Sequence, residues 1–148
     1  MLRRVALAAL AALALTAAPA SAQVPGPYAA QLAQQLARGE TALRDQGFSR
    51  VAGPFAGGLP SRGERRVPIT LRAGQEYRIF GVCDADCTDL DLRLLEGGGA
   101  TPISEDLAAN DVPLLAVRPR ATGQYVIQVL MPGCASAPCY FAVNVYAR

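Results

Sequence analysis

Apolar and polar residues alternate one by one along much of the chain after Phe48. The clearest stretches are residues 66–72, 89–94 and 141–146. Successive side chains of a β-strand point to opposite faces, so a period of two predicts strands with one buried and one solvent-facing side. The positions predicted to be buried are Val67, Ile69, Leu71, Leu90, Leu92, Leu94, Phe141, Val143 and Val145. In the last stretch, Ala142, Asn144 and Tyr146 are predicted to face outward.

Further short apolar pairs extend this pattern to seven or eight strands. They fall at residues 51–55, 77–79, 115–117 and 125–129. Glycine, proline and asparagine mark turns between the strands, at residues 57–60, 73–74, 97–99, 110–111 and 122–123. No helical pattern lies between the strands, which favours an all-β, antiparallel β-sandwich over an α/β fold.

One helix is predicted before the strands, at residues 27–46. Tyr28, Leu32, Leu36 and Leu43 lie near one face of it, Pro27 stands at its start and a glycine follows its end. We expect its leucine face to pack on the edge of the sandwich; a helix that binds a partner is the alternative. The expected organisation is an N-terminal helical segment at 23–47 and a β-sandwich domain at 48–148.

The first 22 residues have the three parts of a cleavable signal peptide. Arg3 and Arg4 precede an apolar stretch at 5–18, and Ala20-Ser21-Ala22 forms a small-residue cleavage site. The apolar stretch is shorter than the roughly 20 residues needed to span a bilayer. We therefore expect export, to the periplasm or the medium, with no membrane insertion after cleavage.

Removing this leader changes the charge of the protein. The whole chain has 14 basic and 12 acidic residues. The leader holds two of the basic residues and no acidic ones, so the mature formal charge is zero. A neutral domain has no overall field to attract nucleic acid or an anionic membrane, and we expect neither as a partner.

Four cysteines, at positions 83, 87, 134 and 139, fall into two closely spaced pairs. In an exported chain of this size, four cysteines are typical of two disulfides, which allow three connectivities. Local pairing, Cys83 with Cys87 and Cys134 with Cys139, is the prediction that we favour. A four-thiolate zinc site is the alternative, but it usually requires Cys-x-x-Cys spacing.

The residue types that the chain lacks restrict its chemistry. It contains no histidine, lysine or tryptophan. Catalytic triads, serine–lysine dyads, Schiff-base lysines and histidine metal sites are thereby excluded from a single chain. Paired carboxylates remain as a possible hydrolytic device. We expect no enzyme activity and no catalytic residues.

Four of the seven aspartates, Asp84, Asp86, Asp89 and Asp91, lie within eight residues. Clustered carboxylates repel one another unless solvated or bridged by a cation, and oxygen ligands suit Ca²⁺. The spacing is not that of an EF-hand loop. The alternative assigns Asp84 and Asp86 to a clasped turn and places Asp89 and Asp91 on the wet face of a strand. No cofactor is predicted other than this possible Ca²⁺.

Two smaller features have structural and functional alternatives. Arg62, Arg65 and Arg66 form a basic patch, for which a solvated loop and strand face is favoured over an anion site. Tyr140 and Tyr146 are placed on the outer face of the last strand, where they either contact a ligand or flank the helix.

Several motifs resemble those of bacterial pre-peptidase C-terminal (PPC) domains. The motifs are Leu71-Arg72-Ala73-Gly74-Gln75-Glu76-Tyr77, Asp89-Leu90-Asp91-Leu92-Arg93-Leu94 and Thr122-Gly123-Gln124-Tyr125-Val126-Ile127-Gln128-Val129. The segments 83–92 and 131–134 are closer still to small exported bacterial proteins of that type. The resemblance covers roughly residues 50–147 and implies a jelly-roll-like β-sandwich in an accessory domain.

The function predicted from these features is that of an exported, non-catalytic β-sandwich module. It would bind a protein or a surface polymer, or stabilise the cell envelope. One alternative is a Ca²⁺-dependent ligand-binding domain that uses Asp84–Asp91. A minor alternative is a hydrolase that uses carboxylates alone.

Overall fold

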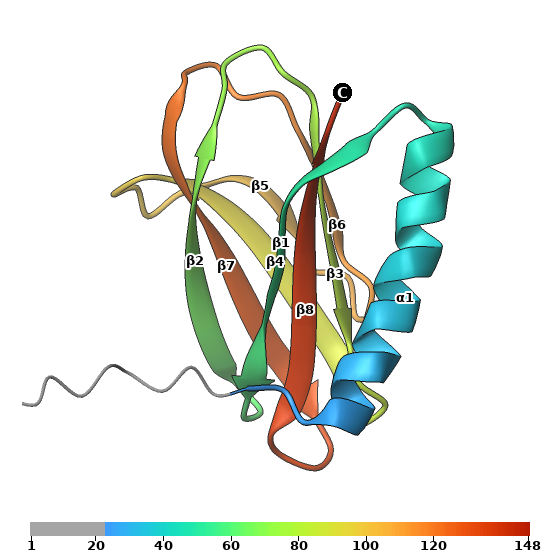
Figure 1. Cartoon of the computed structure of the whole chain (residues 1–148). Helices are drawn as coiled ribbons and strands as arrows, with labels where there is room; N and C mark the ends of the chain where they lie inside the picture. The colour runs from blue at the N-terminus through green and yellow to red at the C-terminus, as the bar shows by residue number, and fades with distance from the viewer. Residues whose placement is uncertain (1–22) are drawn as a thin grey trace, which may run out of the picture.

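The computed structural model describes residues 23–148, so the predicted leader at 1–22 lies outside the described residues. One helix, α1, precedes eight strands (Figure 1). Their bounds are α1 Gly26–Asp45, β1 Ser49–Leu59, β2 Gly63–Leu71, β3 Tyr77–Cys83, β4 Cys87–Glu96, β5 Pro102–Asp106, β6 Leu114–Val117, β7 Gly123–Cys134 and β8 Cys139–Ala147. The predicted all-β sandwich with one N-terminal helix is confirmed.

The strands form two four-stranded antiparallel sheets. Sheet A has the order β1-β8-β3-β6, and sheet B has the order β2-β7-β4-β5. The pairs β1·β8, β2·β7, β3·β6 and β4·β5 are all antiparallel. This nested pairing of the first strand with the last, the second with the seventh and so on is a jelly roll. The predicted jelly-roll-like topology is therefore present.

The core lies between the two sheets and is built from the alternating apolar positions. The nine positions predicted to be buried all belong to it. Tyr77, Ile79, Leu115, Tyr125, Ile127 and Met131 join them from the other strands. β5 was not expected from its own sequence, because its pattern is half-exposed throughout and its side chains contribute little to the core.

Helix α1 packs on the outer face of sheet A, over β3 and β8 (Figure 1). Leu32 and Leu36 contact Val82 and Ala142, while Leu43 contacts the ring of Tyr146. Gln35 fixes the helix further, because its Nε2 donates a hydrogen bond of 2.7 Å to the carbonyl of Cys83. No helix among the described residues is both long and apolar enough to span a bilayer.

The prediction of a solvent-facing side for the last strand was wrong. Ala142, Asn144 and Tyr146 are 2%, 0% and 0% exposed. The reason is α1, which covers this face of β8. Period-two alternation predicts one wet side only when nothing packs on it, and strand β8 is buried on both sides.

The prediction of a turn at residues 57–60 was also wrong in its extent, since strand β1 runs to Leu59. Gly57 pairs with Phe141 inside this strand. A Cβ atom at position 57 would collide with Nη1 of Arg65, which reaches across to donate to the carbonyl of Ala56. The glycine here therefore provides room for a crossing side chain rather than a turn.

Candidate functional site

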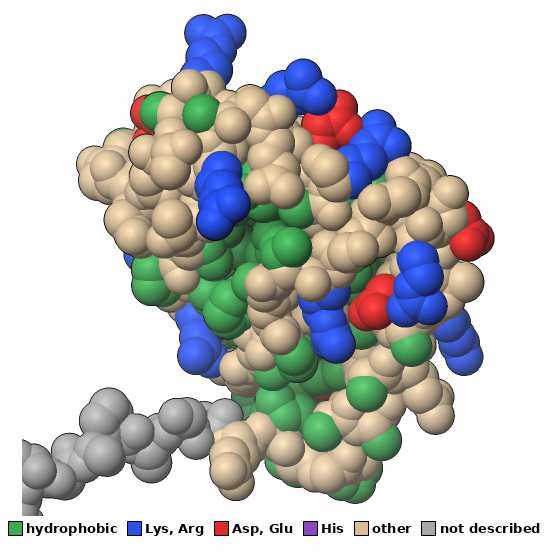
Figure 2. All heavy atoms as spheres, turned by 45° about the horizontal axis from the view of Figure 1, so that its top comes forward, with side chains coloured by type: hydrophobic (Ala, Val, Ile, Leu, Met, Phe, Trp, Pro, Cys, Tyr) green, Lys and Arg blue, Asp and Glu red, His purple; other side chains and the backbone are tan. Residues whose placement is uncertain are grey.

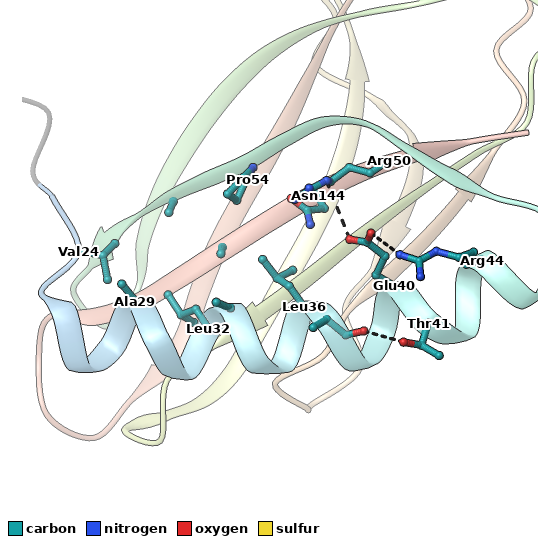
Figure 3. Close-up of a pocket in the computed structure, with 14 residues that line it drawn as sticks. Val24, Ala29, Leu32, Leu36, Glu40, Thr41, Arg44, Arg50, Pro54 and Asn144 are labelled. Carbon is teal, nitrogen blue, oxygen red and sulfur yellow. Dashed lines mark hydrogen bonds and ion pairs between the residues drawn. The ribbon is translucent and has the colours of Figure 1, made fainter.

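A groove of about 520 Å³ lies between α1 and β1 on the outer face of sheet A (Figure 3). It exists because α1 covers β3 and β8 but has little contact with β1, the outermost strand of this sheet. We call it the α1–β1 groove. Its walls come from the helix, and its floor comes from β1 and β8.

The groove is lined mainly by small apolar side chains, which leave space between the helix and the sheet. Ala29, Ala33 and Ala37 are spaced four residues apart, so they share one face of the helix. Ala56 of β1 and Ala142 of β8 form the facing floor. Val24, Leu32, Leu36 and Pro54 complete the apolar lining. This site was not predicted from the sequence, although the row of alanines beside the row of leucines on the helix could have indicated it.

One end of the α1–β1 groove is charged. Glu40 of the helix forms ion pairs with Arg44, at 2.9 Å, and with Arg50 of β1, at 3.9 Å (Figure 3). Both arginines are largely exposed, so each pair contributes little to stability, typically under about 1 kcal/mol. Their effect is to make this end of the groove polar.

Asn144 lies on the floor of the groove beside this polar end (Figure 3). Its side chain is fully buried, and its Nδ2 donates to the hydroxyl of Tyr146 at 3.1 Å. Its Oδ1 has no hydrogen-bond partner among the described residues. A buried acceptor without a donor costs roughly 1–3 kcal/mol, and this oxygen lies against Gly53 of β1 rather than in the open part of the groove.

Tyr146, next to Asn144, keeps its proton at neutral pH. Burial raises the pKa of its phenol above the usual value, and the nearby Glu40 carboxylate acts in the same direction. Tyr146 is fully buried beneath α1 and does not line the groove, so its phenol supplies no base there. Tyr140, the other tyrosine of this strand, stacks on Tyr28 of the helix at 4.7 Å between ring centroids. Both tyrosines flank the helix, as the favoured alternative expected.

The two cysteine pairs form the predicted local disulfides. Cys83–Cys87 joins the end of β3 in sheet A to the start of β4 in sheet B, and Cys134–Cys139 joins β7 in sheet B to β8 in sheet A. The two bridges lie side by side, since Cys87 and Cys134 are register partners. Both therefore hold the two sheets together at the same end of the sandwich.

The structure separates the four clustered aspartates. Asp84 is 1% exposed, and its carboxylate accepts hydrogen bonds from the backbone N–H groups of Asp86, Cys87 and Tyr140. Asp89 and Asp91 instead lie on the outer side of β4. Among residues 23–148, no three cysteine, aspartate or glutamate side chains gather closely enough to hold a metal ion. This geometry supports the structural alternative for Asp84.

Calcium binding by Asp84, Asp86, Asp89 and Asp91 stays a prediction, and it can be tested directly. A ligand that binds only the folded state raises the melting temperature. Because the geometry of residues 23–148 offers no calcium site, we expect millimolar Ca²⁺ to leave the melting temperature of the mature protein unchanged. Thermal unfolding with calcium and with chelator measures this. A calcium-dependent rise in melting temperature would restore the metal site.

The carboxyl group of Asp91 has a raised pKa in the folded protein. Burial raises its pKa, and the charge of Asp89 raises it further, while Arg93 opposes the shift. One oxygen of Asp89 and one of Asp91 are buried without a hydrogen-bond partner in the described part of the chain. A pKa raised by folding means that the charged form is less favourable in the folded state. The free energy of unfolding therefore falls as pH rises through the interval between the ordinary and the raised pKa.

Asp91→Asn is accordingly expected to stabilise the protein at pH 7. The gain should shrink as pH falls and vanish below the ordinary aspartate pKa of about 3.9, where Asp91 is protonated in both states. Urea unfolding at a series of pH values measures the difference. Glu96→Gln, at the exposed end of β4, is the control and should show no such trend. A gain that is independent of pH would contradict this account.

The three arginines of the predicted basic patch do not converge. Arg62 occupies the turn between β1 and β2 with a φ of 64°. Arg65 donates to the carbonyl of Ala56, and Arg66 faces away from the core on β2. The favoured interpretation, a solvated loop and strand face, agrees with this arrangement.

The chain matches no protein-family model and no curated protein sequence. Among solved structures, it is similar to PliG of Aeromonas hydrophila, a periplasmic lysozyme inhibitor of g-type lysozyme. The TM-score is 0.48 and the identity 15%, over 68% of this chain and 86% of that one. Similarity at this level does not indicate which residues of the chain act, or on what. The resemblance to PPC domains stays a prediction.

Proposed function

We propose that the mature chain is an exported, non-catalytic module that binds a partner protein through the α1–β1 groove. The observation that carries this proposal is the groove itself. It is preformed, mostly apolar and open to solvent, and its charged groups, Glu40, Arg44 and Arg50, lie at one end. Such a combination of apolar walls and few polar groups is typical of binding sites.

The chemistry of the groove favours a protein segment over a surface polymer. Sugar polymers are usually bound by stacking on exposed aromatic rings and by many hydrogen bonds, and none of the residues of 23–148 that line the groove is aromatic. An extended segment of a partner could lay apolar side chains against Ala33 and Ala37. Such a segment would lie on the outer face of sheet A, between α1 and β1.

A non-catalytic role is supported by the side chains near the cavities. The α1–β1 groove has one carboxylate, Glu40, and it is paired with arginines. Two carboxylates, Asp84 and Asp111, line a smaller polar pocket of about 350 Å³. Asp84 there is occupied by three backbone N–H groups, so it is not placed to exchange protons with a substrate. The proposal therefore includes no hydrolase activity.

Export to the periplasm or the medium is part of the proposal. It is supported by the leader pattern and by two disulfides, which persist in oxidising compartments. Intact-mass analysis of the protein recovered outside the cytoplasm should give a chain that begins near Gln23 and takes up no alkylating reagent. Four alkylatable thiols in that protein would contradict the disulfides and the compartment together.

The binding role is tested by blocking the groove. Ala33→Glu places a charge on the helix face that lines the groove, while Ala30→Glu places the same charge on an exposed face that does not. Tagged mature proteins would be incubated with envelope extract from the source cells and the captured proteins quantified. We expect a protein that is retained by the wild type and by Ala30→Glu and is lost from Ala33→Glu.

Both variants change an exposed alanine to glutamate in one helix, so their effects on helix stability should match. Circular dichroism and melting curves check this. Capture that is equal for the two variants would refute binding at the groove, and capture of nothing by the wild type under conditions that preserve its fold would refute the binding role.

A further inference from the structure

A third cavity opens between the two sheets, at the edge formed by β1 and β2. Its volume is about 550 Å³, and we call it the inter-sheet cleft. Figure 2 looks toward this edge and shows an apolar hollow with basic side chains around it. The cleft lies outside the α1–β1 groove and shares no lining residue with it.

The cleft exists because β1 is irregular along this edge. The register of β1 with β8 shifts twice, between Arg50 and Ala52 and between Ala52 and Phe55. Gly53 within this stretch has a φ of 100°, a conformation that favours glycine. Such bulges bend a strand and increase its local twist. The first half of β1 consequently diverges from β2, and the two sheets do not close on each other at this edge (Figure 1).

The cleft reaches the main core. Leu71, Tyr77 and Val145, all nearly fully buried, form its deep surface. Phe55 and Val51 stand at the rim, and Val51 is 56% exposed. An apolar chain inserted between the sheets would cover this exposed surface and extend the core, at a gain of about 25 cal/mol per Å² of apolar surface buried. The volume lies within the usual range of small-molecule sites.

The charge at the mouth of the cleft has one sign. Arg72 is the charged residue of the lining, and its guanidinium takes part in none of the ion pairs found among residues 23–148. Gln75 adjoins it. The Oε1 of Gln75 accepts the hydrogen bond of the Tyr77 hydroxyl at 3.1 Å, which leaves the Nε2 donors available. Two donor groups and a positive charge suit a carboxylate, which only accepts.

We propose that the inter-sheet cleft binds a straight-chain fatty acid. Its acyl chain lies between β1 and β2, and its carboxylate meets Arg72 and Gln75. The apolar depth selects the hydrocarbon, and the lone arginine at the mouth selects the charge. This site does not depend on protein binding at the α1–β1 groove, and either proposal can fail without the other.

The experiment uses the mature, disulfide-bonded protein and laurate below its micellar concentration. Isothermal titration calorimetry should show saturable binding to the wild type. Arg72→Gln should weaken the affinity about tenfold or more, because it removes the charge and one bidentate donor. Arg66→Gln on the outer side of β2 removes an arginine that forms no ion pair and does not line the cleft, so it should bind like the wild type.

Two further arms separate the parts of the proposal. Methyl laurate, which has the same chain without the charge, should bind the wild type no better than laurate binds Arg72→Gln. Ala52→Leu fills the cleft and should abolish laurate binding while the melting curve shows a folded protein. Absence of laurate binding to the wild type, equal affinities of the two arginine variants, or undiminished binding by a folded Ala52→Leu would each overturn the assignment.

Discussion

Replacing Asp84 by alanine is expected to lower the free energy of unfolding by about 3 kcal/mol or more. The side chain is buried and accepts from three backbone N–H groups. Each donor left unsatisfied in a buried place costs roughly 1–3 kcal/mol. One of these donors, Tyr140, belongs to β8, so the substitution also removes a hydrogen bond between the loop at 83–87 and the last strand. Chemical unfolding of both proteins at neutral pH measures the change.

Asp86→Ala is the matched control. Asp86 lies in the same disulfide-closed loop, but its side chain forms none of the hydrogen bonds found there. Its replacement should cost less than about 1 kcal/mol, as surface substitutions usually do. The loss of stability for Asp84→Asn should lie between those of the two alanine variants, because the amide keeps one acceptor oxygen but turns its NH₂ donor toward a backbone N–H group. Equal effects of Asp84→Ala and Asp86→Ala would show that the carboxylate does not hold the loop.

Phe48→Ala is expected to cost about 3–5 kcal/mol, the usual range for removing a buried aromatic side chain. Phe48 lies three residues after the end of α1 and is 2% exposed, packed against Leu43 and Tyr146. Two guanidinium groups, of Arg78 and Arg148, lie 4.7 and 4.6 Å from its ring centroid. Its removal should loosen the helix from sheet A, and therefore also widen the α1–β1 groove.

Two measurements check this result. Urea unfolding measures the loss of stability. Leu107→Ala is the control, because Leu107 is an exposed residue of the β5–β6 connection. Its replacement should change the free energy of unfolding by less than about 0.5 kcal/mol. Hydrogen exchange should show faster exchange in α1 than in the core strands β4 and β7. A loss below about 1 kcal/mol, with α1 still protected, would show that the helix is held by its leucines alone.

The sequence alone predicted the architecture well, for a local reason. Alternation reports on neighbours two residues apart, so the buried sides of β2, β4 and β7 could be read directly from the chain. The leucines of the helix were equally readable, since Leu32, Leu36 and Leu43 repeat with the helical period. Short loops around the cysteine pairs likewise made local disulfides the favoured connectivity.

The site could not be predicted in the same way, because it depends on which elements pack together. The second buried side of β8 arises from α1, which lies about a hundred residues earlier in the chain than Asn144 and Tyr146. The sequence offered two roles for Asp84, a Ca²⁺ ligand and a residue of a clasped turn, but it did not show that one of its hydrogen-bond donors is the N–H group of Tyr140, 56 residues away. Nothing in the local sequence around residue 84 points to residue 140.

The amino-acid sequence by itself thus determined a two-sheet sandwich with a flanking helix and two local disulfides, since these follow from the short-range periods and spacings of side chains. The tertiary structure alone decided where the molecule is hollow. Ala33 and Ala56 look like ordinary small residues in the sequence, and Arg72 like an ordinary surface charge. They become the walls of a groove and the mouth of a cleft for two reasons. Helix α1 packs over β3 and β8 and leaves the outer face of β1 largely uncovered. The bulges of β1 bend its first half away from β2.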